Sequence, residues 1–422
     1  MAEPIIYHID VNSAFLSWEA VFRLKFLGSS LDLRTVPSAV GGDVEQRHGI
    51  ILAKSIPAKS YHIKTGESVP EALQKCPFLQ LVPPNYGLYE RCSKAFLGIL
   101  REYTPSVEQY SIDEAYMDMT SLSALHGDLV ETAEQIRGRI RDELGFTVNI
   151  GVSSNKLLAK MASDMRKPDM VHTLFPDEIR TKMWGLPVTD LFFVGRATAG
   201  KLFKLGIHTI GELAGTDPQL LRLHFKSYGD LLWNFANGRD FSVVESERAP
   251  NKGYGNSTTI SFDVTDERTA KIVLLALAET VGMRLRRDHV KIRVISVSIR
   301  SWQLEYCSHQ KVLSNPTNIT DEIWMAACGL FDEMWDHVPI RHLGIHTGQA
   351  ESESACRQMV LFDPVDYQKL EDWDRTIDKI RGRYGLDAVK RSVFLAAPRI
   401  DHLSGGISRE KRTVDYDKIQ MK

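Results

Sequence analysis

The chain has 422 residues, of which 43% are hydrophobic and 25% are charged. This length predicts two to four domains at roughly 150 residues each, and the composition excludes a wholly disordered protein. The 52 basic and 54 acidic residues give a net charge of −2, which excludes a histone-like polycation but leaves room for a local basic surface.

The sequence predicts a soluble, cytoplasmic protein without a membrane anchor. Its longest clean apolar run, Ile272–Ala278, is far shorter than the roughly 20 residues that span a bilayer. The first residues have neither the basic nor the apolar part of a signal peptide. The five cysteines are odd in number and scattered, which argues against a disulfide framework and suits a reducing compartment.

The first 165 residues predict a ferredoxin-like α+β domain with an insertion after its first helix. A short apolar run ends in a carboxylate and is followed by residues at helical spacing, and similar alternations continue along the chain. The expected strands are Ile5–Asp10, Gly49–Ala53, a pair within Val107–Met119, and Phe146–Val152; the expected helices are Val11–Phe26, one beginning at Pro70, Tyr89–Tyr103, Asp128–Leu144 and Asn155–Met165.

Short helices are expected after Pro168 as far as Asn237, followed by a polar linker with Pro250 and Gly253. A second small α+β domain comes next. Its expected elements are a strand at Gly255–Asp263, a helix at Thr269–Arg287, a strand at Val290–Ile299, a helix at Asp321–Trp335 and a strand at Ile340–Thr347. The polar tail contains one further helix, Trp373–Arg383.

Three acidic residues form the first candidate site: Asp10 at a strand end, and Asp113 with Glu114 in a turn. Carboxylates between apolar strand residues are costly to desolvate unless a cation binds them, and Mg²⁺ prefers such oxygens together with substrate phosphates. Neighbouring strand residues face opposite ways, so Asp113 and Glu114 share a site only if a turn or bulge reorients one. Spacing alone leaves an ordinary surface turn equally open.

Three segments carry a family resemblance: His8–Phe15 (His-Ile-Asp-Val-Asn-Ser-Ala-Phe), Tyr110–Asp118 and Gly151–Pro168. Their order and separation resemble the motifs of Y-family translesion DNA polymerases, in particular bacterial DNA polymerase IV, from about residue 5 to at least residue 350. The resemblance implies a palm, small fingers, a helical thumb and a separate α+β little finger. It also implies template-directed, low-fidelity DNA synthesis with two Mg²⁺ ions; no segment resembles a proofreading exonuclease.

The resemblance assigns roles residue by residue. Asp10 and Asp113 would hold both Mg²⁺ ions, and Glu114 would complete the catalytic cage near the primer 3′-OH. The backbone carbonyl of Val11 would be a further ligand. Phe15 falls at the aromatic steric gate, where its ring would exclude a ribose 2′-OH by clash. From helical periodicity alone, Phe15 would be a core residue.

Three lysines are expected to bind the triphosphate. Lys167 aligns with the family's triphosphate-binding lysine, although a solvated lysine before a helix-ending proline is the simpler interpretation. In the fingers strand, Ala53, Ile56 and Lys59 replace a Thr or Ser, a Tyr and an Arg of polymerase IV, and lysine cannot form arginine's bidentate fork. Because polymerase V has a basic residue at the position of Lys54, we expect Lys54 and Lys59 to contact phosphate together.

Two stretches are candidates for DNA binding. Phe193–Ile207 resembles a helix–hairpin–helix element in which Gly195 exposes backbone amides to a phosphate and Lys201 adds a charge, although Ala197 replaces its second glycine. From Arg284 to Arg300 six basic residues accompany one acid, which by itself indicates a solvated face. The resemblance favours non-specific DNA contacts there, from Arg284, Arg286, Arg287, Lys291 and Arg293.

The run Arg357–Phe362 resembles the pentapeptide that binds the DNA sliding clamp, with Gln358, Leu361 and Phe362 as its anchors. A five-residue match also arises by chance, and the alternative is a strand joining the tail. In polymerase IV this motif commonly ends the chain, whereas about sixty residues follow it here, as in polymerase V. We expect distributive synthesis unless the clamp is bound.

The sequence also offers features of a cyclase, of a histidine metal site and of a non-catalytic adaptor. Gly41–Glu45 is similar to a diguanylate cyclase signature, but the residues after its Asp differ and it precedes the main acidic turn. His337, His342 and His346 lack the cysteines or acids of a metal site. A polymerase-like adaptor that binds DNA and clamp without catalysis remains the main alternative; retention of all three carboxylates favours the enzyme.

The resemblance thus predicts an α+β multidomain polymerase whose partners are primer–template DNA, dNTPs and the sliding clamp. We expect a monomer in the cytoplasm, associated with the nucleoid. The predicted divisions are palm 1–27 and 81–167, fingers 28–80, thumb 168–237, linker 238–252, little finger 253–349 and tail 350–422.

Overall fold

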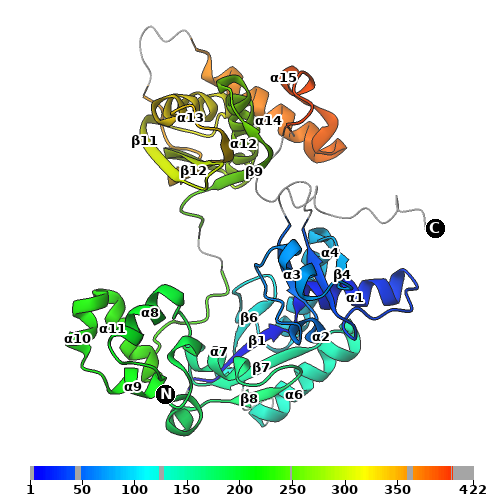
Figure 1. Ribbon diagram of the computed structural model, residues 1–422, viewed down its shortest axis with the longest axis vertical. Helices are drawn as coiled ribbons and strands as arrows, with labels where there is room; N and C mark the ends of the chain where they lie inside the picture. Colours follow the sequence, from blue (N-terminus) through cyan, green and yellow to red (C-terminus); the bar gives the residue numbers. More distant parts are fainter. Residues whose placement is uncertain are drawn as a thin grey trace. The chain divides into compact units, whose positions relative to one another are not determined.

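The computed structural model describes residues 4–42, 49–122, 128–247, 250–358, 365–400 and 402. Figure 1 shows the chain from its N-terminus in blue to the tail in orange and red. The chain divides into two units, which we call the N-terminal unit (Met1–Gly41, Ile51–Glu67 and Glu71–Arg248) and the C-terminal unit (Gly42–Ile50, Ser68–Pro70 and Ala249–Lys422). Within the described residues, no helix is long and apolar enough to cross a membrane.

A five-stranded sheet forms the centre of the N-terminal unit, in the order β5-β6-β1-β7-β8. The middle strand β1 pairs antiparallel with β6 and β7, and β7 pairs parallel with β8. The strands are β1 (Ile6–Val11), β5 (Val107–Gln109), β6 (Glu114–Asp118), β7 (Val148–Ser153) and β8 (Val171–Thr173). The expected ferredoxin-like arrangement is therefore present, with the short edge strand β8 in addition.

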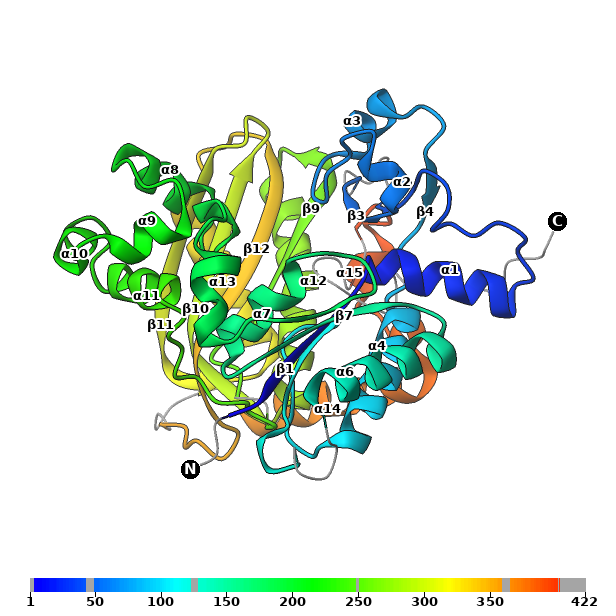
Figure 2. The same ribbon diagram turned by 90° about the horizontal axis from the view of Figure 1, so that it is seen from below.

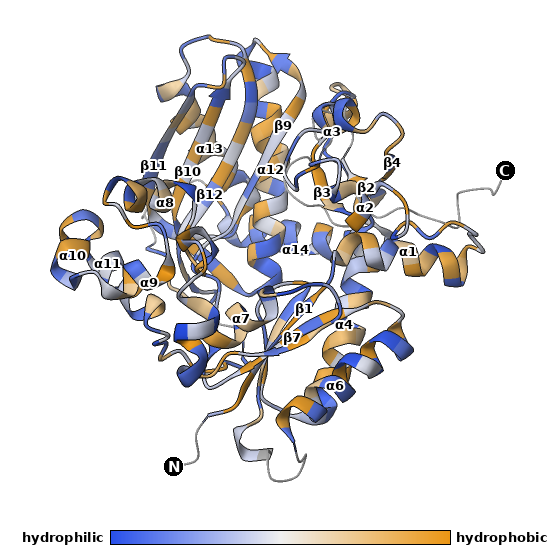
Figure 3. Cartoon of the chain, turned by 60° about the horizontal axis from the view of Figure 1, so that its bottom comes forward, coloured by the Kyte–Doolittle hydropathy of each residue, from blue (hydrophilic) through white to orange (hydrophobic). Residues whose placement is uncertain are grey.

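Alternating residues give this sheet two different faces, as the orange and blue residues along β1 and β7 indicate (Figure 3). Tyr7, Ile9 and Val11 enter an apolar core together with helices on one face. Figure 2 shows helices α4 and α6 on that side of β1 and β7, and α7 on the other. The helices are α1 (Ala14–Phe26), α4 (Tyr86–Tyr103), α6 (Leu129–Arg139), continued by a π-helical turn over Ile140–Leu144, and α7 (Lys156–Asp164).

Two further parts complete the N-terminal unit. A three-stranded sheet, ordered β3-β2-β4, lies in the insertion after α1. It comprises β2 (Ser38–Gly41), β3 (Ile51–Lys54) and β4 (Gln80–Val82), with helices α2 (Ile56–Lys59) and α3 (Val69–Lys75). The segment after β8 is helical, as expected. Its helices are α8 (Arg196–Lys204), α9 (Ile210–Gly215), α10 (Pro218–Phe225) and α11 (Ser227–Ala236).

The C-terminal unit is an antiparallel sheet ordered β11-β10-β12-β9, with two helices packed on it. Its elements are β9 (Gly255–Val264), α12 (Glu267–Arg287), β10 (Val290–Ser301), β11 (Tyr306–Thr317), α13 (Thr320–Met334) and β12 (Ile340–Ser352). β11 is the main element that the sequence analysis missed. It is an edge strand with mostly exposed side chains, so its sequence lacks the apolar alternation of a half-buried strand.

The tail is packed onto the C-terminal unit. Helix α14 (Tyr367–Tyr384) starts six residues earlier than predicted and is followed by α15 (Ser392–Leu395). Phe394 and Ile400 are buried in the same apolar core as α12 and the sheet. The strand β12 also continues past the predicted end of the little finger at residue 349. The tail helices are thus a further layer of this unit.

Candidate active site

The register of two strands brings two of the predicted carboxylates together. In β1, Asp10 lies directly opposite Glu114, the first residue of β6. Both residues alternate with core residues, namely Ile9 in β1 and Ala115 in β6, so both face away from the apolar core. Side chains directly opposite on one sheet face lie about 5 Å apart at Cβ. Asp10 and Glu114 are therefore neighbours on the face covered by α7.

Asp113 joins them because it lies outside the regular strand. It occupies the bend before β6, and its backbone carbonyl accepts a hydrogen bond of 3.0 Å from the Val11 N–H. The Ser111 hydroxyl donates to Asp113 Oδ1 at 2.6 Å. In a regular strand, the side chains of Asp113 and Glu114 would point to opposite faces of the sheet. Because Asp113 lies in the turn, this restriction does not apply to it.

Helix α7 crosses this face of the sheet at very close range. A Cβ built on Gly151 would lie 1.9 Å from the Ala159 carbonyl oxygen, so no larger residue fits under the helix. The Asn155 side chain caps the helix by accepting from the Leu158 N–H at 2.9 Å. This approach places Lys160, on the buried side of α7, directly beside the carboxylates.

Two lysines from this segment pair with the carboxylates. Lys160 Nζ lies 2.8 Å from Glu114 Oε1 and 3.7 Å from Asp10 Oδ2. Lys167 Nζ lies 2.5 Å from Asp10 Oδ2. Asp164 contacts both ammonium groups. The predicted triphosphate-binding Lys167 is therefore at the site, but in contact with a predicted metal ligand.

The carboxylates differ in electrostatic environment. Burial raises the pKa of Asp113, the Ser111 hydroxyl opposes this, and the charges of Asp10 and Glu114 raise the pKa further. Burial also acts to raise the pKa of Glu114, but His8 and Lys160 lower it to about 2. The described residues give Asp113 no ion pair with a lysine or arginine. Negative charge is thus least compensated at Asp113.

His8 is a site residue to which the sequence analysis gave no role. Its fully buried ring has Nδ1 2.7 Å from the Ser163 hydroxyl, which itself donates to the Lys160 carbonyl at 2.8 Å. Nδ1–H is then the donor. The other nitrogen, Nε2, has no hydrogen-bond partner among the described residues and lies 3.7 Å from Glu114 Oε2. Its position between the apolar residues of β1 could have identified His8 as facing the carboxylates.

The donor set suits a hard divalent cation. Three carboxylates converge from β1 and the β6 turn, and carboxylate oxygens are the ligands that Mg²⁺ prefers. In this structure Glu114 pairs with the ammonium group of Lys160, and Asp10 pairs with that of Lys167, where the expected metal ions would otherwise bind. As the side chains are arranged, no three acidic, histidine or cysteine residues of the described ranges enclose a common point. Cation binding therefore requires the lysines to move.

Phe15, near the start of α1, lies between two apolar cores. Its partly buried ring stacks on Tyr89 with centroids 4.4 Å apart and an interplanar angle of 9°. It packs against the core under the five-stranded sheet and against the core of the three-stranded sheet. Phe15 thus packs as a partly buried residue between the two cores, and its role as a steric gate stays a prediction.

Of the other predicted phosphate contacts, Lys54 is partly buried, and Lys59, Gly195 and Lys201 are exposed. Burial lowers the pKa of Lys54, and the charge of Lys59 lowers it further, so the two lysines are close enough to repel each other. Gly195 is the N-cap of α8, and space is open around it. Lys201 is exposed on the same helix. Each arrangement leaves donors available to an anion.

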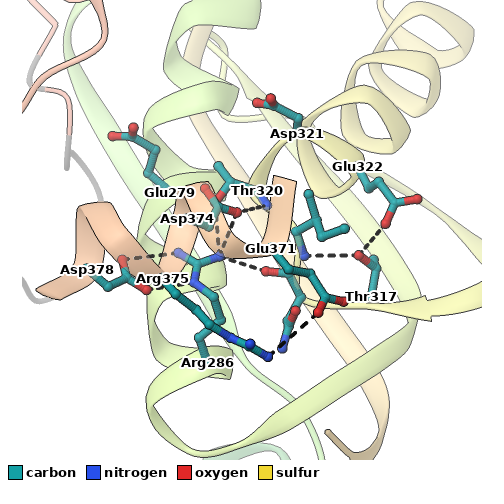
Figure 4. A network of polar contacts seen from close by, with 12 residues as sticks. Glu279, Arg286, Thr317, Thr320, Asp321, Glu322, Glu371, Asp374, Arg375 and Asp378 are labelled. Atoms are coloured by element: carbon teal, nitrogen blue, oxygen red, sulfur yellow. Dashed lines mark hydrogen bonds and ion pairs between the residues drawn. The ribbon is translucent and has the colours of Figure 1, made fainter. Parts of the chain in front are cut away.

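The basic run Arg284–Arg300 does not form the expected DNA-binding surface as a whole, because two of its residues form ion pairs with the tail. Arg286 is buried, donates to Asp374 at 3.0 Å and to Asp378 at 2.6 Å, and reaches the Asn318 carbonyl at 2.7 Å (Figure 4). Lys291 pairs with Glu371 of the same tail helix at 2.9 Å. Neither side chain is available to a DNA phosphate in this arrangement, so both assignments are corrected to structural roles.

The remaining predicted contacts of this run have different partners and exposures. Arg284 donates to the Gly255 carbonyl at 2.9 Å and lies over the Tyr254 ring. Arg293 pairs with Glu351 at 2.6 Å. Within the part of the chain that the structure describes, Arg287 pairs only with its neighbour Asp288, and its side chain is 71% exposed. Of the five, Arg287 is the most accessible.

The face of the four-stranded sheet opposite its apolar core is polar. Residues aligned across β9, β12, β10 and β11 form two adjacent rows, of which the first is Ser257, Gly344, Ser298 and Ser308, and the second is Thr259, His342, Arg300 and Tyr306. The residues between these rows, such as Leu343 and Ile299, enter the core on the other face. Small polar side chains with an exposed arginine allow close approach of a polyanion.

The clamp-motif residues are only partly within the described ranges. Gln358 has an exposed side chain, while its backbone pairs with Asn315 of β11 through bonds of 2.7 and 3.2 Å. Leu361 and Phe362 lie outside the described residues. The first residue of the motif is thus attached by its backbone and presents its side chain to solvent.

Comparisons with known proteins agree with this architecture. The impB/mucB/samB family matches residues 9–164, its C-terminal domain matches residues 251–361, and the helix–hairpin–helix motif of the same family matches residues 176–207. A solved Y-family DNA polymerase chimera, 22% identical, superimposes with a TM-score of 0.69 over 82% of this chain and 98% of that chain. That likeness establishes the fold.

Relatives identified by sequence are substantially closer. DNA polymerase IV of Clostridium acetobutylicum is 46% identical over 93% of this chain and 98% of its own. DNA polymerase IV of Acetivibrio thermocellus is 39% identical over 93% and 97%, and DNA polymerase IV 1 of Bacillus subtilis is 38% identical over 93% of each. The chain therefore belongs to the impB/mucB/samB family and is a Y-family, DNA polymerase IV-like protein.

Proposed function

We propose that the protein is a template-directed DNA polymerase acting in translesion synthesis. The observation that carries this function is the pairing of Asp10 with Glu114 on one face of the sheet, with Asp113 in the adjacent turn, within a chain related to DNA polymerases IV over nearly its whole length. Primer extension in the presence of Mg²⁺, on undamaged and abasic templates, tests it. Extension past the abasic site by the wild type is the expected result.

The carboxylates would hold two Mg²⁺ ions, with the Val11 carbonyl as a further ligand. When bound, the ions supply Lewis-acid activation of the primer 3′-OH and neutralise charge on the leaving pyrophosphate. Asp10 and Asp113 would contact both ions, and Glu114 would complete the cage on the primer side. Asp113 has the least compensated charge, which supports its role as a ligand.

Nucleotide binding would use lysines from two sides. Lys167 is at the site already, and Lys54 and Lys59 form a second cationic pair in the three-stranded-sheet region. Each ammonium is a point charge without arginine's fixed geometry, so the site would neutralise the triphosphate rather than orient it tightly. This fits the loose selection of a low-fidelity polymerase.

Phe15 would reject ribonucleotides. Phe15→Ala should lower the preference for dNTPs over rNTPs by about two orders of magnitude, the scale on which one pocket contact discriminates substrates. Single-nucleotide incorporation kinetics with matched dNTP and rNTP measure the change. Phe15 also stacks on Tyr89, so its replacement changes packing as well. Thermal unfolding of Phe15→Ala and of Phe15→Leu therefore separates the effect on sugar selection from the effect on stability. Phe26→Ala, at an exposed position of the same helix, is the control; unchanged sugar selection by Phe15→Ala would leave Phe15 a core residue only.

DNA would contact the protein along its backbone. In the N-terminal unit, the amides at Gly195 and the charge of Lys201 would bind phosphate. In the C-terminal unit, we assign the main contact to the polar sheet face with Arg300 instead of to Arg286 and Lys291, with Arg284, Arg287 and Arg293 as secondary candidates. Such contacts do not read sequence and weaken strongly with salt.

The motif at Gln358, Leu361 and Phe362 would bind the sliding clamp. Changing these residues to alanine together should remove stimulation by the clamp and leave distributive synthesis unchanged. The solvent-exposed Gln358 side chain supports the assignment. Product-length distributions with and without loaded clamp give the measurement. If distributive synthesis falls by the same factor as clamp-stimulated synthesis, the segment has a structural role. The protein would act as a monomer.

A further inference from the structure

A third carboxylate lies beside the two lysines of the candidate active site. Asp164 is the last residue of α7, one helical turn after Lys160 and three residues before Lys167. Its Oδ1 lies 2.8 Å from Lys167 Nζ, and its Oδ2 lies 3.4 Å from Lys160 Nζ. Lys160 and Asp164 are four residues apart in the helix and therefore share a helix side, whereas Lys167 lies in the segment that follows the helix. Asp164 thus contacts each ammonium group with a different oxygen.

The ammonium of Lys167 bridges Asp10 and Asp164. Its distance to Asp10 Oδ2 is 2.5 Å, and an ammonium has donors enough for both bonds. The Asp10 side chain is 11% exposed, whereas that of Asp164 is 46% exposed. A divalent cation on the same Asp10 oxygen would repel the ammonium at short range. The bond from Lys167 to Asp10 must therefore break when a cation binds, whereas the bond to Asp164 can remain.

We propose that Asp164 is a positioning residue that retains the Lys167 ammonium when Asp10 takes up a divalent cation. The proposal rests on the metal role of Asp10 and the triphosphate role of Lys167 given above. Asp10 exchanges one cation for another, while Asp164 keeps Lys167 at the edge of the site where the triphosphate arrives. Without Asp164, the contacts of the described residues leave Lys167 only Asp10 as a carboxylate partner, so it competes directly with the metal.

Binding of Mn²⁺ to the full-length protein, without DNA or nucleotide, tests the exchange directly. Electron paramagnetic resonance of free Mn²⁺ measures the dissociation constant. Lys167→Met should tighten binding, and Asp164→Asn should weaken it, each by about two- to fivefold, the scale of a partly exposed ion pair. Asp332→Asn is the matched control. Asp332 pairs with Lys271 at the same distance of 2.8 Å and is also 46% exposed, but it lies in α13.

The double variant Asp164→Asn/Lys167→Met distinguishes an effect of Asp164 through Lys167 from the simple loss of a negative charge. If Asp164 acts through Lys167, Asp164→Asn should lose most of its effect when Lys167 is already methionine. If Asp164 merely contributes negative potential, it weakens Mn²⁺ binding by the same factor in both backgrounds, and the proposal is wrong. Absence of any weakening by Asp164→Asn in the wild-type background also overturns it.

Nucleotide kinetics give a second readout. Asp164→Asn should raise the KM for dNTP more than it lowers kcat, and Asp164→Glu should restore most of the KM because a carboxylate returns. Equal loss in both parameters, without rescue by glutamate, would contradict a positioning role. Failure of the proposed function is distinguishable, because Mn²⁺ binding that does not depend on Asp113 removes the metal site itself. Binding that depends on Asp113 but ignores Asp164 removes only this inference.

Discussion

Replacing Asp113 by alanine is expected to abolish primer extension and to leave primer–template binding intact. Asp113 carries the least compensated charge of the site, because burial raises its pKa and the charges of Asp10 and Glu114 raise it further. Without this carboxylate the cage for divalent cations loses a shared ligand. Lewis-acid stabilisation of a phosphoryl transition state is worth several kcal/mol, so the rate should fall by a factor of about 10³ or more.

A denaturing gel of extended primers, run beside a mobility-shift assay, measures both quantities. Asp118→Asn is a suitable control, since Asp118 ends β6, the strand that follows Asp113, but pairs with Ile6, away from Asp10. Retained extension by Asp113→Ala would remove the metal assignment. If neither protein extends a primer that both bind, the adaptor alternative is favoured. Extension by the wild type and the control alone supports the polymerase and its metal site together.

Replacing Arg286 by alanine is expected to destabilise the C-terminal unit and not merely to weaken DNA binding. The guanidinium side chain is 6% exposed, and it compensates Asp374, which is 7% exposed. Removing one partner of a buried ion pair leaves the other charge uncompensated, which costs about 3–5 kcal/mol. Arg286 also satisfies the Asn318 carbonyl, so the variant loses a buried hydrogen bond as well.

Calorimetric unfolding of the full-length protein, in which the unit's transition can be followed, measures this loss. Arg287→Ala is the matched control, because Arg287 is the next residue and is largely exposed. We expect it to change stability by less than about 0.5 kcal/mol. If Arg286→Ala lowers DNA affinity and its salt dependence with unchanged stability, Arg286 is a DNA contact after all. Deletion from residue 365 onward should destabilise the same transition.

The sequence by itself determined the parts whose chemistry is local. The family resemblance of three motifs predicted the roles of Asp10, Asp113 and Glu114, and the apolar periodicities located most helices and the central strands. A short motif predicts such residues because its backbone conformation and its chemistry depend on the same few neighbours. The ferredoxin-like fold and the family could be predicted for this reason.

Only the tertiary structure decided which charges meet. The basic run looked like one DNA-binding surface, yet Arg286 and Lys291 pair with acids about eighty or more residues later in the chain. Likewise, Lys160 became a site residue only because α7 packs closely over Gly151. The edge strand β11 gave no periodic signal since most of its side chains are exposed. A charge pattern shows that a cation is present, but burial and partners fix its role, and both depend on contacts between distant segments.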